Sequence, residues 1–95
     1  MSIQPIQLSN RTKEMDEKIY ELANLEIWNR NGHFFVRYDA GAHQRVIRED
    51  EISKDDAFHA LKGPQETNDV LLKLQKHLIV NGLDPYTSNL KATEL

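Results

Sequence analysis

The chain has 95 residues, which corresponds to one small domain. It contains no cysteine, so disulfide bonds, thiolate zinc sites, iron–sulfur clusters and cysteine nucleophiles are excluded. The formal net charge is −3 and the pI is about 5.7, which argues against non-specific binding to nucleic acid.

The sequence carries no signal for secretion or membrane insertion. No apolar stretch approaches the roughly 18–20 residues that a membrane span needs. Residues 1–8 have neither the basic region nor the apolar region of a secretory signal. We therefore expect a cytoplasmic protein with no membrane association.

The N-terminal quarter is predicted to contain a tail and then a helix. Residues 1–9 show no periodicity, so we expect a flexible N-terminal tail. A helical pattern starts near Arg11, because Met15, Ile19 and Leu22 follow one another at i, i+4 and i+7. Charged side chains occupy the opposite side, as in an amphipathic surface helix.

A β-hairpin is predicted next, over Leu25–Arg30 and His33–Tyr38. The two runs are separated by Asn31-Gly32, and this dipeptide favours the type I′ turn of a two-residue hairpin loop. A loop of two residues determines the register of the strands. The predicted pairs on one face are Arg30 with His33, Trp28 with Phe35, and Glu26 with Arg37. Those on the other face are Asn29 with Phe34, Ile27 with Val36, and Leu25 with Tyr38.

A third strand is predicted over His43–Arg48. A three-residue loop, Asp39-Ala40-Gly41, would precede it, with Gly41 in the left-handed conformation that such loops favour. This loop length predicts the following pairs: Phe34 with Val46, Val36 with Gln44, Phe35 with Arg45, and Arg37 with His43.

Two helices are predicted to complete the fold. Ser53 is suited to cap the first, and Gly63 followed by Pro64 ends it. Thr67 is expected to cap the second, which ends before Gly82.

The expected fold class is therefore α+β, with helices packed on one face of a three-stranded antiparallel β-meander in the order α-β-β-β-α-α. The domain should span residues 10–86, followed by a flexible C-terminal tail at 87–95.

The predicted registers give the sheet two different faces. One carries apolar residues that suit a core, namely Leu25, Ile27, Phe34, Val36, Tyr38 and Val46. The other mixes aromatic and basic side chains with a few others, namely Glu26, Trp28, Arg30, His33, Phe35, Arg37, His43, Arg45 and Ile47.

Three interpretations of the second face stay open. In the first, the predicted helix that Thr67 would cap, or the N-terminal tail, covers this face. In the second, a protein partner binds it, since tryptophan, phenylalanine and arginine are enriched at interface hot spots. In the third, single-stranded nucleic acid stacks on its aromatic rings, with arginines at the phosphates. The candidate macromolecule-binding residues are Trp28, Arg30, His33, Phe35, Arg37, His43 and Arg45.

The last predicted helix has more apolar residues than one stripe requires. Val70, Leu71, Leu74 and Leu78 form the main stripe, while Leu72 and Ile79 lie off it, seven residues apart. Leu72 and Ile79 are thus candidates for an interface between two copies in a symmetric dimer. The alternative is a well-packed C-terminal helix in a monomer.

No catalytic or metal-binding pattern is present. The four histidines lack ligand spacing, and no Gly-x-Ser-x-Gly elbow or glycine-rich phosphate loop occurs. We therefore expect no metal and no cofactor, and a non-enzymatic accessory or regulatory protein that acts by protein–protein binding, as a homodimer in one version of this hypothesis. Single-stranded nucleic-acid binding is the alternative, and a small enzyme with an unrecognised site is the third hypothesis.

Overall fold

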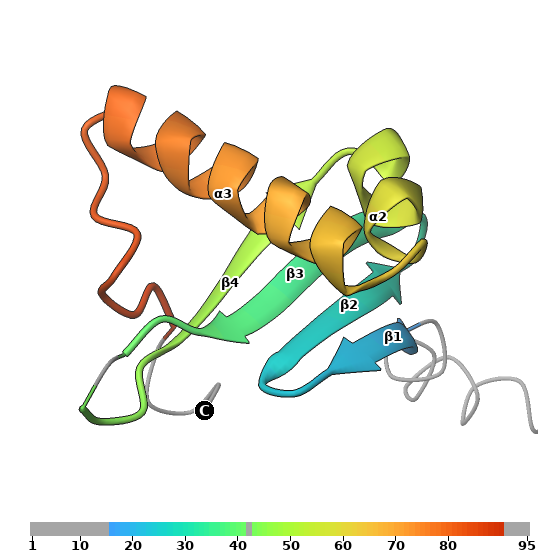
Figure 1. The fold of residues 1–95 in the computed structure, drawn as a ribbon, viewed down its shortest axis with the longest axis horizontal. Helices are drawn as coiled ribbons and strands as arrows, with labels where there is room; N and C mark the ends of the chain where they lie inside the picture. Colours follow the sequence, from blue (N-terminus) through green and yellow to red (C-terminus); the bar gives the residue numbers. More distant parts are fainter. Residues whose placement is uncertain (1–15, 42, 91–95) are drawn as a thin grey trace, which may run out of the picture.

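The computed structural model describes residues 16–41 and 43–90, which fold into a sheet layer and a helix layer (Figure 1). The antiparallel sheet has the order β1-β2-β3-β4, and both described helices lie on one of its faces (Figure 1). The elements are β1 (Asp16–Leu22), β2 (Leu25–Arg30), β3 (His33–Asp39), β4 (Ile47–Ile52), α2 (Lys54–Ala60) and α3 (Pro64–Val80). The α+β class is confirmed, whereas the prediction of three strands in the order α-β-β-β-α-α is wrong, because the described residues already form a sheet of four strands.

The strand that the sequence analysis did not predict is β1, whose residues were expected to be part of a helix. Met15 and the preceding residues lie outside the described part of the chain, but Asp16–Leu22 is a strand paired with β2. The register shifts between Lys18 and Tyr20, and both Ile19 and Tyr20 pack against the core. Such a bulge breaks the period-2 alternation of a strand. The remaining spacing of apolar residues then resembles a helical stripe.

The central hairpin is confirmed in every predicted pair, from Leu25 with Tyr38 to Arg30 with His33. Asn31 and Gly32 both have positive φ, 57° and 87°, as a type I′ turn requires. The side-chain oxygen of Asn29 also accepts a hydrogen bond from the Gly32 amide at 2.8 Å.

The predicted third strand and its register are wrong, because the loop after β3 is longer than three residues. The carboxylate of Asp39 accepts hydrogen bonds from the amides of Gly41 (2.9 Å) and Val46 (3.0 Å), and the Ala40 amide bonds the Val46 carbonyl. Gly41 is not in the left-handed region; a Cβ there would overlap the carbonyl oxygen of Gln44. The observed strand, β4, therefore begins four residues later than predicted and pairs Phe34 with Ile52, Val36 with Asp50, and Arg37 with Glu49.

Both helices occur near their predicted positions. The Ser53 side chain caps α2, as predicted, by accepting a hydrogen bond from the Asp56 amide. Thr67 does not cap α3, because that helix already begins at Pro64. The buried Thr67 hydroxyl instead lies 2.8 Å from two carbonyl oxygens, those of Ala60 at the end of α2 and of Gly63, the residue before α3. Gly82 follows the helix with a φ of 78°, as a C-terminal glycine should.

The core lies between the sheet and the two helices. The five predicted core residues of the hairpin are buried, whereas Val46 lies in the loop and Ile52 takes its place on the sheet. The buried apolar set is Leu25, Ile27, Phe34, Val36, Tyr38, Ile52, Ala57, Ala60, Val70, Leu74 and Leu78. In the described part of the chain, no helix is long and apolar enough to cross a membrane.

Candidate functional site

Two surfaces contain the residues that the sequence indicated as binding sites, and the first is the sheet face turned away from the helices. We call it the outer sheet face. Its side chains are Asp16, Lys18 and Glu21 from β1, Glu26, Trp28 and Arg30 from β2, His33, Phe35, Arg37 and Asp39 from β3, and Ile47, Glu49 and Glu51 from β4. Because α3 packs on the opposite face, that helix does not cover Trp28 or Phe35 (Figure 1).

The arginines of the outer sheet face are bonded to carboxylates on neighbouring strands. Arg30 donates to Asp16 at 2.8 Å and to both carboxylate oxygens of Glu49, at 3.0 and 3.2 Å. Arg37 donates to the same Glu49 at 3.2 Å. The side chains of Arg30, Arg37 and Glu49 are 27%, 24% and 15% exposed, so these ion pairs are partly shielded from water.

The aromatic rings of this face are also engaged within the chain. The guanidinium carbon of Arg30 lies 4.6 Å from the ring centroid of Trp28 and 5.9 Å from that of Phe35. The indole N–H of Trp28 donates to Glu26 at 2.9 Å, and this hydrogen bond holds the pKa of Glu26 below its ordinary value. Both rings are partly buried and partly covered by the Arg30 side chain.

The electrostatic character of the face differs from the sequence-based expectation. His43 and Arg45 lie in the loop before β4. The positions beside β3 that were predicted for His43 and Arg45 are occupied by Glu49 and Glu51 instead. The outer sheet face therefore carries six carboxylates against three cations, a count that leaves out His33. The structure brings together Trp28, Arg30, His33, Phe35 and Arg37 as predicted, but not His43 or Arg45. At one end of the sheet, however, Arg45 and Arg37 line a polar hollow of about 220 Å³ together with Glu21, Glu26 and Asp39.

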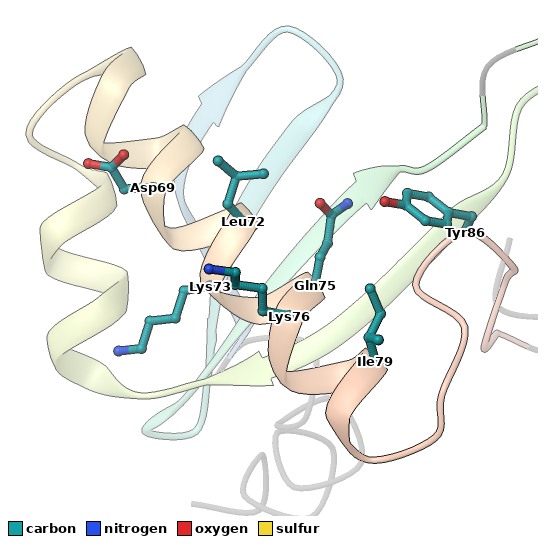
Figure 2. Close-up of a pocket in the computed structure, with 7 residues that line it drawn as sticks. All are labelled: Asp69, Leu72, Lys73, Gln75, Lys76, Ile79 and Tyr86. Atoms are coloured by element: carbon teal, nitrogen blue, oxygen red, sulfur yellow. The ribbon is translucent and has the colours of Figure 1, made fainter.

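The second surface is a groove of about 510 Å³ along the side of α3 that faces away from the sheet (Figure 2). We call it the α3 groove. Its lining residues are Asp69, Leu72, Lys73, Gln75, Lys76, Ile79 and Tyr86. Leu72, Ile79 and Tyr86 are 51%, 55% and 57% exposed, which is unusual for three large apolar or aromatic side chains gathered at one place. The two residues that the sequence indicated, Leu72 and Ile79, thus lie in one site.

The sequence analysis missed Tyr86, which reaches the groove from the segment after α3. Figure 2 shows its ring extending toward Gln75. The backbone on either side of Tyr86 is anchored by Arg48, whose Nη1 atom donates to the carbonyl oxygens of Asp84 and Thr87, both at 3.0 Å. Arg48 is only 5% exposed, so this anchor lies inside the protein.

The Arg48 anchor is completed by neighbouring polar groups. Arg48 makes a two-pronged ion pair with Asp50, with both nitrogen–oxygen distances at 2.9 Å. The Tyr38 hydroxyl donates to the carbonyl oxygen of Pro85, and burial raises the pKa of Tyr38. We call Arg48, Asp50, Tyr38 and the carbonyls of Asp84, Pro85 and Thr87 the Arg48 clasp. No periodicity signals it, because an arginine at a core position of a strand looks in sequence like a solvated charge.

The described residues show no arrangement typical of a metal site. No group of three or more histidine, aspartate or glutamate side chains within residues 16–41 and 43–90 is placed to hold a metal ion. Comparison with known proteins gives no matching family model, no matching curated protein and no matching solved structure, so the chemistry of these two surfaces carries the functional argument.

Proposed function

We propose that this chain is a small non-enzymatic accessory or regulatory protein that acts by protein–protein binding through the α3 groove. The observation that carries the proposal is the convergence of Leu72, Ile79 and Tyr86, each more than half exposed, on one hollow. A groove that exposes apolar side chains beside a helix is a common docking surface for a second helix.

The apolar residues alone support only weak binding. Burying a fully exposed large apolar side chain contributes about 1.5–3 kcal/mol, so three half-exposed ones contribute roughly 3 kcal/mol in total. Association costs at least about 4 kcal/mol in lost translational and rotational freedom. A partner must therefore also contact the charged residues that line the groove, namely Asp69, Lys73 and Lys76.

The outer sheet face is less suited to bind a macromolecule, and to single-stranded nucleic acid in particular. To reach phosphates, Arg30 and Arg37 would have to leave Glu49, and the released carboxylate would repel the ligand. Arg30 would also have to uncover Trp28 before a base stacked on it. Both steps weaken binding, so the groove is our preferred site.

The proposal is tested by affinity capture from native lysate with the full chain as bait. Leu72→Glu combined with Ile79→Glu places two charges in the groove, and we expect it to abolish capture of specific partners. Val80→Glu is the matched control, because Val80 is 83% exposed on the same helix and does not line the groove. Equal capture by the groove variant and the wild type, with both folded by circular dichroism, would contradict the proposal.

A further inference from the structure

We infer that the occupant of the α3 groove is a second copy of this chain, docked antiparallel along α3 about a two-fold axis. The inference rests on the proposed function, since it takes the groove to be a protein-binding surface and specifies the partner. Antiparallel docking of two copies is isologous, so each contact on one side of the axis is repeated on the other.

The first support is the placement of charged and apolar residues along α3. Asp69, Leu72, Lys76 and Ile79 follow at i, i+3, i+7 and i+10, so they share one face of the helix. The buried residues Val70, Leu74 and Leu78 define the opposite face. Asp69 and Lys76 are separated by two helical turns, about 10.5 Å, with Leu72 between them.

This pattern is complementary to itself in one orientation only. When two α3 helices pair antiparallel with the axis near Leu72, Asp69 lies beside Lys76 of the partner subunit, and the same ion pair forms a second time across the axis. Leu72 then packs against Leu72 of the partner subunit, and Ile79 lies against the first turns of the partner's helix. A parallel, in-register pair would place Asp69 and Lys76 each beside its own copy, which is repulsive.

Both charged groups are accessible for such pairing. Lys76 makes no hydrogen bond or ion pair with the described residues, whereas Lys73 is already bonded to Asp56 at 3.0 Å. The Asp69 side chain is 56% exposed, and the Nε2 atom of His59 lies 3.9 Å from its carboxylate. An ion pair with the partner subunit therefore costs neither residue a strong contact within the chain.

The size of the surface determines how tight the dimer is. A helix of 17 residues is about 25 Å long, so one pair of helices covers less than the roughly 800 Å² per partner of stable complexes. The dimer should therefore be reversible and depend on protein concentration. The two ion pairs select the antiparallel orientation more than they add affinity.

Sedimentation equilibrium of the full chain over a range of concentrations, up to about 1 mM, tests the inference. We expect a monomer–dimer equilibrium for the wild type. Asp69→Lys alone and Lys76→Glu alone each place like charges at both ion-pair positions, and each should raise the dissociation constant by about tenfold. The double variant Asp69→Lys with Lys76→Glu should restore the wild-type constant, because it exchanges the signs.

Mixing the two single variants provides a second measurement on chains that each carry one substitution. The Asp69→Lys chain has a lysine at both position 69 and position 76, and the Lys76→Glu chain has a carboxylate at both positions. The heterodimer of these two chains therefore forms both ion pairs and should be tighter than either homodimer. A wild type that sediments as a monomer throughout, or a double variant that stays as weak as the single ones, would overturn the inference. If capture from lysate still depends on Leu72 and Ile79 in that case, the proposed function stands with a different partner. If neither self-association nor capture depends on these residues, both the inferred dimer and the proposed function are refuted.

Discussion

The Arg48 clasp makes a sharp prediction about stability, because it places a buried ion pair where the sheet meets the C-terminal segment. Replacing Arg48 with methionine keeps an unbranched apolar stem but removes the guanidinium group, so Asp50 is left without its cation. It also removes the donor that holds the carbonyls of Asp84 and Thr87. The substitution should therefore destabilise the whole domain and release the segment that carries Tyr86.

The magnitude follows from the burial of the pair. The side chains of Arg48 and Asp50 are 6% and 11% exposed, so solvent screens their interaction little. Removing one partner of such a pair costs about 3–5 kcal/mol, because the other charge stays buried and unpaired. A domain of 95 residues has a total stability of about 5–14 kcal/mol. Arg48→Met should therefore remove a large fraction of the free energy of unfolding.

Two further variants separate the charge from the geometry. Arg48→Lys keeps the charge but cannot bond both Asp50 oxygens and both carbonyls, so we expect a loss of about 1.5–3 kcal/mol. Arg48→Met combined with Asp50→Leu removes both charges and should recover at least half of the loss of the single variant. In this double variant the amides of residues 84–90 should still exchange faster than in the wild type, because the carbonyl anchors are absent.

Urea unfolding followed by circular dichroism measures these free energies, and amide hydrogen exchange measures the release of the segment. Arg45→Met is the matched control, because Arg45 is an exposed arginine in the loop before β4. Its expected effect is within about 0.5 kcal/mol. If Arg48→Met costs no more than Arg45→Met, Arg48 does not hold the sheet and the C-terminal segment together.

Two other predictions concern the loop after β3 and the core tyrosine. Gly41→Ala should lower the free energy of unfolding in urea by about 1–3 kcal/mol, because the added Cβ overlaps the Gln44 carbonyl and the loop must shift. Gly63→Ala is the control, since a Cβ at Gly63 meets only the end of a flexible glutamate side chain. Equal losses for the two variants would refute the packing argument. Burial raises the pKa of Tyr38 above its ordinary value of 10.0, so its stabilising contribution is fully present below pH 10 and is lost as the pH rises through the folded-state pKa. Unfolding free energies at increasing alkaline pH should fall more steeply for the wild type than for Tyr38→Phe, and parallel curves would show that Tyr38 does not titrate in this way.

The sequence predicted well those parts of the fold that depend on local interactions. The β2–β3 hairpin follows from the turn preference of Asn31-Gly32, which determines the register of all six residue pairs. Ser53 as a helix cap and Gly82 as a C-terminal glycine likewise depend on the backbone within a few residues.

The strand β1 shows why a short apolar pattern is ambiguous. Its bulge between Lys18 and Tyr20 places two successive residues, Ile19 and Tyr20, against the core. The alternation expected of a strand is therefore lost, and the residues that remain match a helical spacing. Only the pairing of β1 with β2, which involves residues further along the chain, distinguishes the two structures.

The character of the candidate sites depended on β4, where local patterns gave the wrong strand. Ile47–Ile52 has four charged residues in succession, a run typical of solvent-exposed backbone rather than of a strand. These charged side chains are accommodated because they alternate between the two faces of the sheet and find partners on each. Arg48 and Asp50 pair with each other on the core side, and Glu49 pairs with Arg30 and Arg37 on the outer side. The second set of pairs turns a predicted basic surface into an acidic one with its arginines engaged. The first set anchors Tyr86 beside Leu72 and Ile79, so the same strand that closes the outer sheet face also completes the α3 groove.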